Sequence, residues 1–195
     1  IFEPIPVVPT CHYMMGGTPT NINGQAFNRV DEIDSIVPGL FAAGEAACVS
    51  VHGANRLGGN SLLDLVVFGR ATGMFIQEEI KSGGGVKSAG SDDIDAALER
   101  LNKLNESNSG YDTADIKKQL QECMQNYFGV FRRGEFMQKG LNELKEISDK
   151  VSNLHLKDKS NAFNTSRVEA IELQNLFEVA EATAIAAYSR NESRG

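Results

Sequence analysis

Hydrophobic residues are spaced differently in the two halves of the chain. Up to about residue 80 they occur in short runs separated by glycine and proline, such as residues 6–9, which favour a short strand. The run at residues 40–44, which ends at Glu45, is typical of a buried strand. We expect a turn at residues 16–20 and a hairpin after it. This part of the chain is therefore predicted to be α/β.

A glycine-rich stretch leads into a helix before the spacing changes. Asn60 or Ser61 can cap a helix that continues to about Lys81. The order of strand, glycine-rich loop and helix start is typical of a ligand-binding site, because the first-turn N–H groups and the helix dipole favour an anion or an electron-rich ring edge.

From residue 91 onward, apolar residues recur at helical spacing among Lys, Glu and Gln. The pattern predicts four helices that form an antiparallel bundle with short loops. The expected helices cover residues 92–105, a segment that Asp112 or Thr113 caps and that carries Ile116, Leu120, Cys123 and Met124, residues 134–154, and residues 165–190. The predicted boundaries are an α/β part at residues 1–81, a flexible connector at 82–90 and a helical domain at 91–195.

Charge and composition exclude several classes of protein. With 19 Lys and Arg against 26 Asp and Glu, the formal net charge is −7, so we expect no nucleic-acid partner and no binding to an anionic membrane surface. The longest strongly apolar run, residues 62–68, is too short for a membrane span and contains Asp64. Cys11, Cys48 and Cys123 are far apart, which predicts reduced thiols and no metal site.

Polar groups that suit ligand chemistry gather in residues 44–63. Arg56 is the only arginine between positions 30 and 69, and its planar guanidinium suits a carboxylate, although it could equally pair with a surface acid. Glu45 is placed to accept hydrogen bonds from a ribose, or it is a solvated loop acid. His12 can donate to a substrate oxygen, and His52 can either contact ligand or position the Arg56 loop.

Three segments resemble the succinate dehydrogenase flavoproteins. They read Thr-Cys-His-Tyr-Met-Met-Gly-Gly (10–17), Pro-Gly-Leu-Phe-Ala-Ala-Gly-Glu (38–45) and His-Gly-Ala-Asn-Arg-Leu-Gly-Gly-Asn-Ser-Leu-Leu-Asp-Leu-Val-Val-Phe-Gly-Arg (52–70). The similarity continues through residues 163–169 and 192–195, and so covers essentially the whole chain. Fumarate reductase and aspartate oxidase flavoproteins share its central part and are the alternative family members.

The resemblance implies the remnant of a Rossmann-like FAD-binding domain followed by a helical bundle. It implies an FAD-dependent enzyme that oxidises succinate to fumarate and passes electrons to an iron–sulfur subunit. His12 and Arg56 would bind the dicarboxylate and Glu45 the FAD ribose. The flavin would meet the helix start at Asn60, Ser61 and Leu62.

The same resemblance predicts where the complete protein resides. It would be held by membrane anchor subunits together with the iron–sulfur subunit, without a span of its own. Its location would be the cytoplasmic face of a bacterial inner membrane, or alternatively the matrix side of the mitochondrial inner membrane.

Several family features are missing from these 195 residues. The dinucleotide glycine motif, the flavin-linking histidine, the His-Pro-Thr segment and the catalytic arginine would all lie upstream, so no catalytic residue is assigned in this chain. We therefore expect a piece of a longer protein that is inactive alone. A non-catalytic helical interaction module is the alternative from another class.

Overall fold

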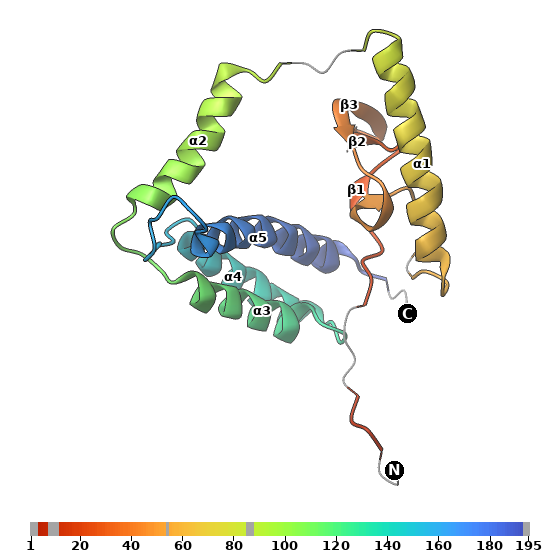
Figure 1. Ribbon diagram of the computed structural model, residues 1–195. Coiled ribbons are helices and arrows are strands. Elements are labelled where there is room, and N and C mark those ends of the chain that lie inside the picture. Colours follow the sequence, from red (N-terminus) through yellow and green to blue (C-terminus); the bar gives the residue numbers. More distant parts are fainter. Residues whose placement is uncertain (1–3, 8–11, 54, 85–87, 193–195) are drawn as a thin grey trace. The chain divides into compact units, whose positions relative to one another are not determined.

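The computed structural model describes residues 4–7, 12–53, 55–84 and 88–192 (Figure 1). Of the described residues, those from 12 to 88 form one compact unit, and those from 89 to 192 form the other together with residues 4–7. The first unit holds the short strands and one helix, and the second is built from helices. The sequence prediction of an α/β part followed by a helical bundle is confirmed.

Four short strands form two separate pairs in the first unit. Strand β1 (Thr18–Pro19) is parallel to β4 (Ala47–Cys48), and β2 (Gln25–Val30) is antiparallel to β3 (Ile33–Phe41). The expected hairpin is therefore present as β2 and β3. It turns at two non-glycine residues with positive φ, Asp31 at 50° and Glu32 at 66°, as type I′ turns require.

Two strand and turn predictions near the start of the chain need correction. The turn predicted at residues 16–20 lies instead at residues 21–24, because the Asn21 side chain accepts hydrogen bonds from the backbone N–H groups of Asn23 and Gln25. The strand predicted at residues 6–9 lies partly outside the described residues, and Pro6 and Val7 are not in a strand.

The buried strand predicted at residues 40–44 is also wrong. Strand β3 ends at Phe41, and every residue before Phe41 in this strand is exposed because the hairpin is a two-stranded ribbon. Gly44, with φ of 73°, begins the 3₁₀ turn η1 (Gly44–Ala46). A Cβ on Gly44 would lie 2.3 Å from Leu65 Cδ2, so a larger residue would have to displace this side chain, and the positive φ also favours glycine.

That neighbouring helix, α1 (Asn60–Lys81), has the predicted length but not the predicted cap. Gly59 is its N-cap residue with φ of 81°, and no side chain caps the helix, so a cap by Asn60 or Ser61 is wrong. The backbone takes over this role. The N–H of Asn60 donates to Leu57 O (3.1 Å) and that of Leu62 donates to Gly59 O (3.2 Å).

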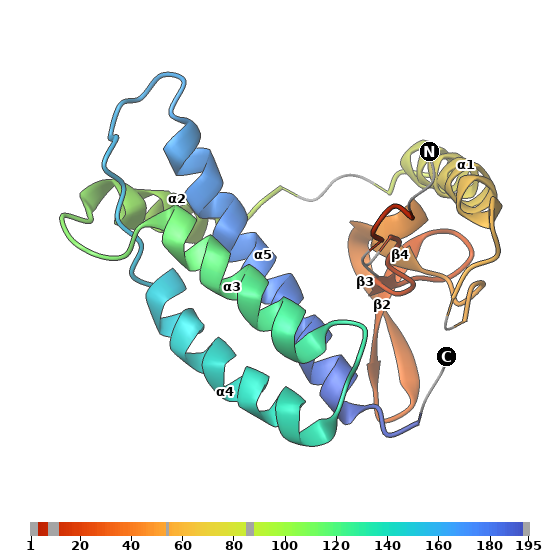
Figure 2. The same ribbon diagram turned by 90° about the horizontal axis from the view of Figure 1, so that it is seen from below.

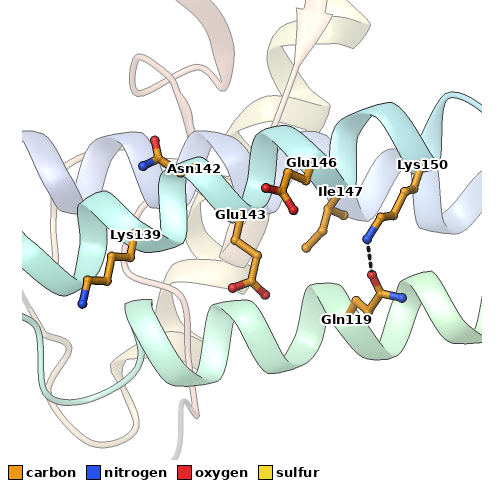
Figure 3. Close-up of a pocket in the computed structure, with 7 residues that line it drawn as sticks. All are labelled: Gln119, Lys139, Asn142, Glu143, Glu146, Ile147 and Lys150. Atoms are coloured by element: carbon orange, nitrogen blue, oxygen red, sulfur yellow. Dashed lines mark hydrogen bonds between the residues drawn. The ribbon is translucent and has the colours of Figure 1, made fainter.

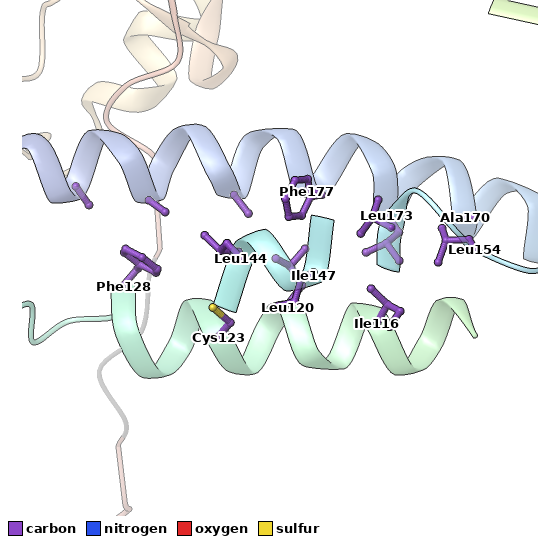
Figure 4. Close-up of a cluster of buried hydrophobic side chains, with 14 of the residues drawn as sticks. Ile116, Leu120, Cys123, Phe128, Leu144, Ile147, Leu154, Ala170, Leu173 and Phe177 are labelled. Carbon is purple, nitrogen blue, oxygen red and sulfur yellow. The ribbon is translucent and has the colours of Figure 1, made fainter. Parts of the chain in front are cut away.

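In the second unit, α3 (Thr113–Phe128), α4 (Gly134–Val151) and α5 (Thr165–Ser189) pack together, with α4 antiparallel to the other two (Figure 2). The predicted cap at Asp112 is confirmed, because its side chain accepts from the Ala114 N–H at 3.0 Å. Asn164 caps α5 in the same way, accepting from the Arg167 N–H at 2.8 Å. Figure 4 shows the core between the helices, which includes Ile116, Leu120, Cys123, Phe128, Leu144, Ile147, Leu173 and Phe177.

Helix α2 (Ser91–Glu106) does not complete the predicted four-helix bundle. Its apolar residues Ile94, Leu98 and Leu101 are exposed, and only Leu104 joins the core. The Arg100 guanidinium holds the helix to α5 by donating to Gln174 Oε1 (2.6 Å), Asn175 Oδ1 (2.8 Å) and Ile171 O (3.3 Å). The bundle is therefore a three-helix core with α2 attached at its edge.

Over the described ranges, no helix combines the length and the apolar character that crossing a lipid bilayer requires.

Candidate functional site

The guanidinium of Arg56 lies over the ring of Tyr13, with Cζ 4.8 Å from the ring centroid. Its Nε is buried and has no hydrogen-bond partner. Among the residues that the structure describes, no carboxylate forms an ion pair with Arg56, so the alternative of a surface ion pair is wrong. Because arginine keeps its charge at any physiological pH, Arg56 is a cation available to an external anion.

Tyr13 lies between Arg56 and His52. Its ring meets the His52 ring edge to face, with centroids 6.2 Å apart and planes at 83°. The Tyr13 hydroxyl is buried without a hydrogen-bond partner. Burial raises the pKa of this phenol, and the negative charges of Asp64 and Glu45 raise it further. Tyr13 therefore stays neutral and offers Arg56 an uncharged aromatic face.

His52 is fixed from its other side by Asp64, which belongs to α1. His52 Nε2 and Asp64 Oδ2 are 2.9 Å apart, and the two side chains are only 14% and 7% exposed. Because an ionised carboxylate can only accept, Nε2 carries the hydrogen and donates it. Of the two roles open to His52, the structure supports that of positioning the loop.

Glu45 lies exposed in η1 and joins this turn to the segment that contains His12 and Tyr13. Its Oε1 accepts a hydrogen bond from the Met14 N–H at 3.1 Å. Gly17 passes against the same turn, where a Cβ would lie 2.5 Å from Ala46 O. The second carboxylate oxygen has no partner within the described part of the chain, so it can accept from a ligand hydroxyl.

The start of α1 offers backbone donors rather than a side-chain cap. Leu62 uses its N–H in a bond to Gly59 O, whereas the N–H of Ser61 has no backbone acceptor within the described ranges. The Ser61 side chain is half-buried and Leu62 is 68% exposed. The first turn is thus open to a ligand that presents an acceptor.

His12 is exposed, and it makes no hydrogen bond or ion pair with any described residue. It is connected to the rest of the site only through its neighbour Tyr13. The structure brings Arg56, Tyr13, His52 and Asp64 together in a series of direct contacts. No hydrogen bond or ion pair joins the Arg56 side chain to the described residues at the helix start.

Two members of this group, Tyr13 and Asp64, were not predicted as site residues. Asp64 had a detectable signal, because it is the only charged residue in the apolar run 62–68. A carboxylate at such a position is buried by the helix and needs a partner. Tyr13 had no comparable signal beyond being next to His12.

A separate hollow lies between α3 and α4 in the helical unit, where Lys150 Nζ donates to Gln119 Oε1 at 2.7 Å (Figure 3). Its lining is mostly polar, and none of the site residues predicted from the sequence belongs to it. Within the described ranges, no group of three or more His, Cys, Asp or Glu side chains is arranged to hold a metal ion.

Comparisons with known proteins match both parts of the chain. A family model described as "FAD binding domain" matches residues 2–62, and one described as "Fumarate reductase flavoprotein C-term" matches residues 117–195. The first range contains Glu45, Arg56 and the start of α1. The second contains most of α3 and all of α4 and α5.

Individual relatives align over nearly the whole chain. The succinate dehydrogenase flavoprotein subunit of Coxiella burnetii is 53% identical over 195 residues, which are 99% of this chain and 33% of that protein. The mitochondrial succinate dehydrogenase flavoprotein of Oryza sativa is 44% identical over 194 residues, 99% of this chain and 31% of the relative. The chain spans about a third of the length of these curated relatives.

A solved structure is also similar to this chain, at lower identity. The mutated FrdA chain of Escherichia coli quinol fumarate reductase superposes with a TM-score of 0.84 and 37% identity, covering 99% of this chain and 32% of the other.

Proposed function

Because the chain belongs to the succinate dehydrogenase and fumarate reductase flavoprotein family, we propose that it supplies part of the dicarboxylate and flavin site of a succinate dehydrogenase flavoprotein subunit. The complete protein oxidises succinate to fumarate. Among these curated relatives the two succinate dehydrogenase subunits are 53% and 44% identical and the fumarate reductase subunit of Proteus vulgaris is 39% identical, which supports this direction of reaction.

The observation that carries the proposal is the unpaired guanidinium of Arg56. It is held against the Tyr13 ring and has no ion-pair partner among the described residues. A planar, permanently charged donor of this kind binds a carboxylate through two parallel hydrogen bonds. Arg56 therefore fixes one end of the dicarboxylate.

His12 supplies a second donor to the substrate. It lies beside Tyr13 in the sequence, and its imidazole is exposed and free of other partners in the described part of the chain. A neutral imidazole nitrogen can donate to a substrate oxygen without adding a formal charge. No residue of this chain is assigned to the proton transfer.

The residues around η1 and the start of α1 fit an FAD molecule. Glu45 has one carboxylate oxygen free to accept from ribose hydroxyls, and its other oxygen is held by Met14 N–H. The unpaired N–H of Ser61 can donate to the edge of the isoalloxazine ring, with Asn60 and Leu62 beside it. FAD, when bound, supplies the acceptor for the hydride of the substrate.

Within this arrangement the protein's part is to position and to stabilise charge. Arg56 and His12 orient the dicarboxylate, and Asn60, Ser61 and Leu62 orient the flavin. The complete protein passes its electrons to an iron–sulfur subunit. It is held peripherally by membrane anchor subunits, at the cytoplasmic face of a bacterial inner membrane or the matrix side of the mitochondrial one.

A steady-state assay of the full-length flavoprotein that contains this segment tests the proposal. Succinate, fumarate and aspartate are compared as substrates with a suitable artificial electron acceptor or donor. We expect kcat/KM to be highest for succinate oxidation. Faster fumarate reduction would favour a fumarate reductase, and turnover of aspartate alone would favour an aspartate oxidase.

A further inference from the structure

We propose that Asp64 and His52 are positioning residues for Arg56, and that they act on it through the ring of Tyr13. The inference rests on the proposed function, because it concerns how the substrate-binding arginine of the same site is held in place.

Three direct contacts connect Asp64 to Arg56. His52 Nε2 donates to Asp64 Oδ2 at 2.9 Å, the His52 ring meets the Tyr13 ring at a centroid distance of 6.2 Å, and the Arg56 guanidinium carbon lies 4.8 Å from the Tyr13 centroid. Tyr13 comes from the segment before β1, His52 and Arg56 from the loop after β4, and Asp64 from α1. The contacts therefore hold three separate segments together.

The ring of Tyr13 determines where the Arg56 guanidinium lies. Arginine has a long side chain with many rotamers, and Nε of Arg56 has no hydrogen-bond partner. The cation–π contact with the Tyr13 ring is then the main described interaction that fixes the position of the guanidinium. The Tyr13 hydroxyl is also without a partner, so the position of this ring depends on its packing against His52.

Asp64 in turn determines the orientation of His52. A buried carboxylate is unfavourable in an apolar run unless it is hydrogen-bonded, and His52 is the side chain that bonds Asp64 within the described ranges. An apolar residue would fill the same space without that penalty. The presence of Asp64 is therefore explained by its bond to His52 rather than by packing.

Asp64 also lies in the helix whose first turn is assigned to the flavin. It follows Asn60 by one helical turn in α1. Asp64, which holds the substrate-binding arginine in place through His52 and Tyr13, and the residues that orient the flavin therefore belong to the same helix. Loss of the Asp64 contact should shift Arg56 relative to the flavin. A displacement of about 1 Å is enough to lower activity about 100-fold.

A double-mutant cycle in the full-length flavoprotein tests the proposal. The probe is malonate, a dicarboxylate that the flavin cannot oxidise to an alkene, and its dissociation constant is measured from the change in the flavin absorbance spectrum. We expect Asp64→Ala to weaken malonate binding by about tenfold or more. In the Arg56→Ala background the same substitution should change malonate binding by less than about twofold. Equal losses in both backgrounds would overturn the proposal.

Conservative variants separate positioning from a general effect on folding. Asp64→Asn keeps an acceptor oxygen and should restore malonate affinity to within about threefold of the unmodified protein. Tyr13→Phe keeps the ring and should be close to neutral, whereas Tyr13→Leu removes it and should match Asp64→Ala. If Asp64→Ala fails to retain FAD, the comparison of Tyr13→Phe with Tyr13→Leu decides, and equal affinities for malonate would overturn the proposal.

Failure of the proposed function has a different signature. An unmodified full-length protein that neither binds malonate nor oxidises succinate would refute the dicarboxylate site itself. A protein that does both, but shows equal effects of Asp64→Ala in the two backgrounds, would refute only the positioning role.

Discussion

The Arg56 guanidinium lies over the Tyr13 ring, with 4.8 Å between Cζ and the ring centroid. This contact joins the segment that contains His12 to the loop that contains Arg56. Cation–π contacts of this kind contribute about 0.5–2 kcal/mol, depending on how far they are removed from water. Tyr13 therefore connects the two residues proposed to bind substrate, because it contacts Arg56 and directly follows His12 in the sequence.

Replacing Arg56 by Ala in the full-length flavoprotein should lower kcat/KM for succinate by about 100- to 1,000-fold. The substitution removes a bidentate, charged contact to a carboxylate in a partly buried site. Arg56→Lys should recover little of this loss, because an ammonium group cannot reproduce the planar pair of donors. Retention of more than about a tenth of the original kcat/KM by a folded Arg56→Ala protein would remove Arg56 from the substrate site.

Replacing His12 by Ala should be damaging but milder than replacing Arg56. His12 contributes a hydrogen bond rather than a permanent charge, and such a bond is worth about 0.5–1.5 kcal/mol, or up to about tenfold in kcat/KM. The measurement is steady-state kinetics beside His52→Ala. A silent His12→Ala would remove His12 from the substrate site. A loss of kcat/KM for His52→Ala that persists in the Arg56→Ala background would then mean that His52 is the substrate-binding histidine.

Substitution of Gly17 by Ala should destabilise the site, whereas Gly16→Ala should be nearly neutral. Gly17 has φ of 123°, and its new Cβ would lie 2.5 Å from Ala46 O, beside the turn that carries Glu45. Backbone strain of this type costs about 1–3 kcal/mol. At Gly16 no atom lies within 4 Å of the added carbon. Thermal unfolding and flavin content of the two full-length variants give the comparison, and equal values would argue against this close approach.

The cap at Asp112 should make the stability of the helical unit depend on acid pH. The hydrogen bond from Lys157 and that from the Ala114 N–H hold the pKa of Asp112 below its ordinary value. A lowered folded-state pKa stabilises the fold above the unfolded pKa of about 3.9, and this stabilisation is lost as the pH falls through the folded value. Asp112→Ala should lower the free energy of unfolding by about 0.5–2 kcal/mol at pH 7, and by less at pH 3.

Urea denaturation of the 195-residue chain, followed by circular dichroism at both pH values, measures this effect. The matched control is Asp149→Ala, since Asp149 is exposed and its side chain makes no hydrogen bond or ion pair with the described residues. It should change the free energy of unfolding by no more than about 0.5 kcal/mol. A loss for Asp112→Ala that is the same at pH 3 and pH 7 would contradict the assigned pKa direction.

The 195 residues alone should neither bind FAD tightly nor oxidise succinate, even with FAD and an artificial acceptor supplied. The glycine motif that would hold the FAD pyrophosphate is missing from this sequence. Large apolar residues of the first unit are exposed, among them Ile33, Leu63 and Val66, whereas the helical unit has its own core. Circular dichroism should report mainly helix, and limited proteolysis should cut first before residue 91. A yellow, active preparation would overturn this expectation.

Local sequence signals were sufficient for the core of the helical unit. The spacing of Ile116, Leu120 and Cys123 predicts that one face of α3 lies in the core, and residue type alone narrows its cap to Asp112 or Thr113, of which Asp112 is the cap. The same kind of spacing predicted the helix α2 correctly but not the burial of its apolar face. Periodicity shows that one face of a helix is apolar, but it does not show what covers that face, and here Ile94 and Leu98 remain exposed.

The candidate site was predictable only in part, for a related reason. Arg56 stood out because it is an isolated charge among glycines, and the structure leaves it unpaired within the described residues. The roles of Tyr13 and Asp64 depend on contacts between segments far apart in the sequence, which spacing cannot reveal. The error at β3 has the same origin, since an apolar run becomes a buried strand only where a second layer covers it.

Because only Arg100 and Leu104 among the described residues attach α2, this helix is less stable against local opening than the core of the helical unit. When this helix separates from α5, it breaks the hydrogen bonds of one guanidinium and uncovers one buried leucine, while the core between α3, α4 and α5 stays closed. Such an opening requires much less free energy than unfolding of the whole unit. We therefore expect the backbone amides of α2 to exchange with solvent deuterium through this local opening, and those in the middle of α3 and α5 to exchange mainly when the core opens.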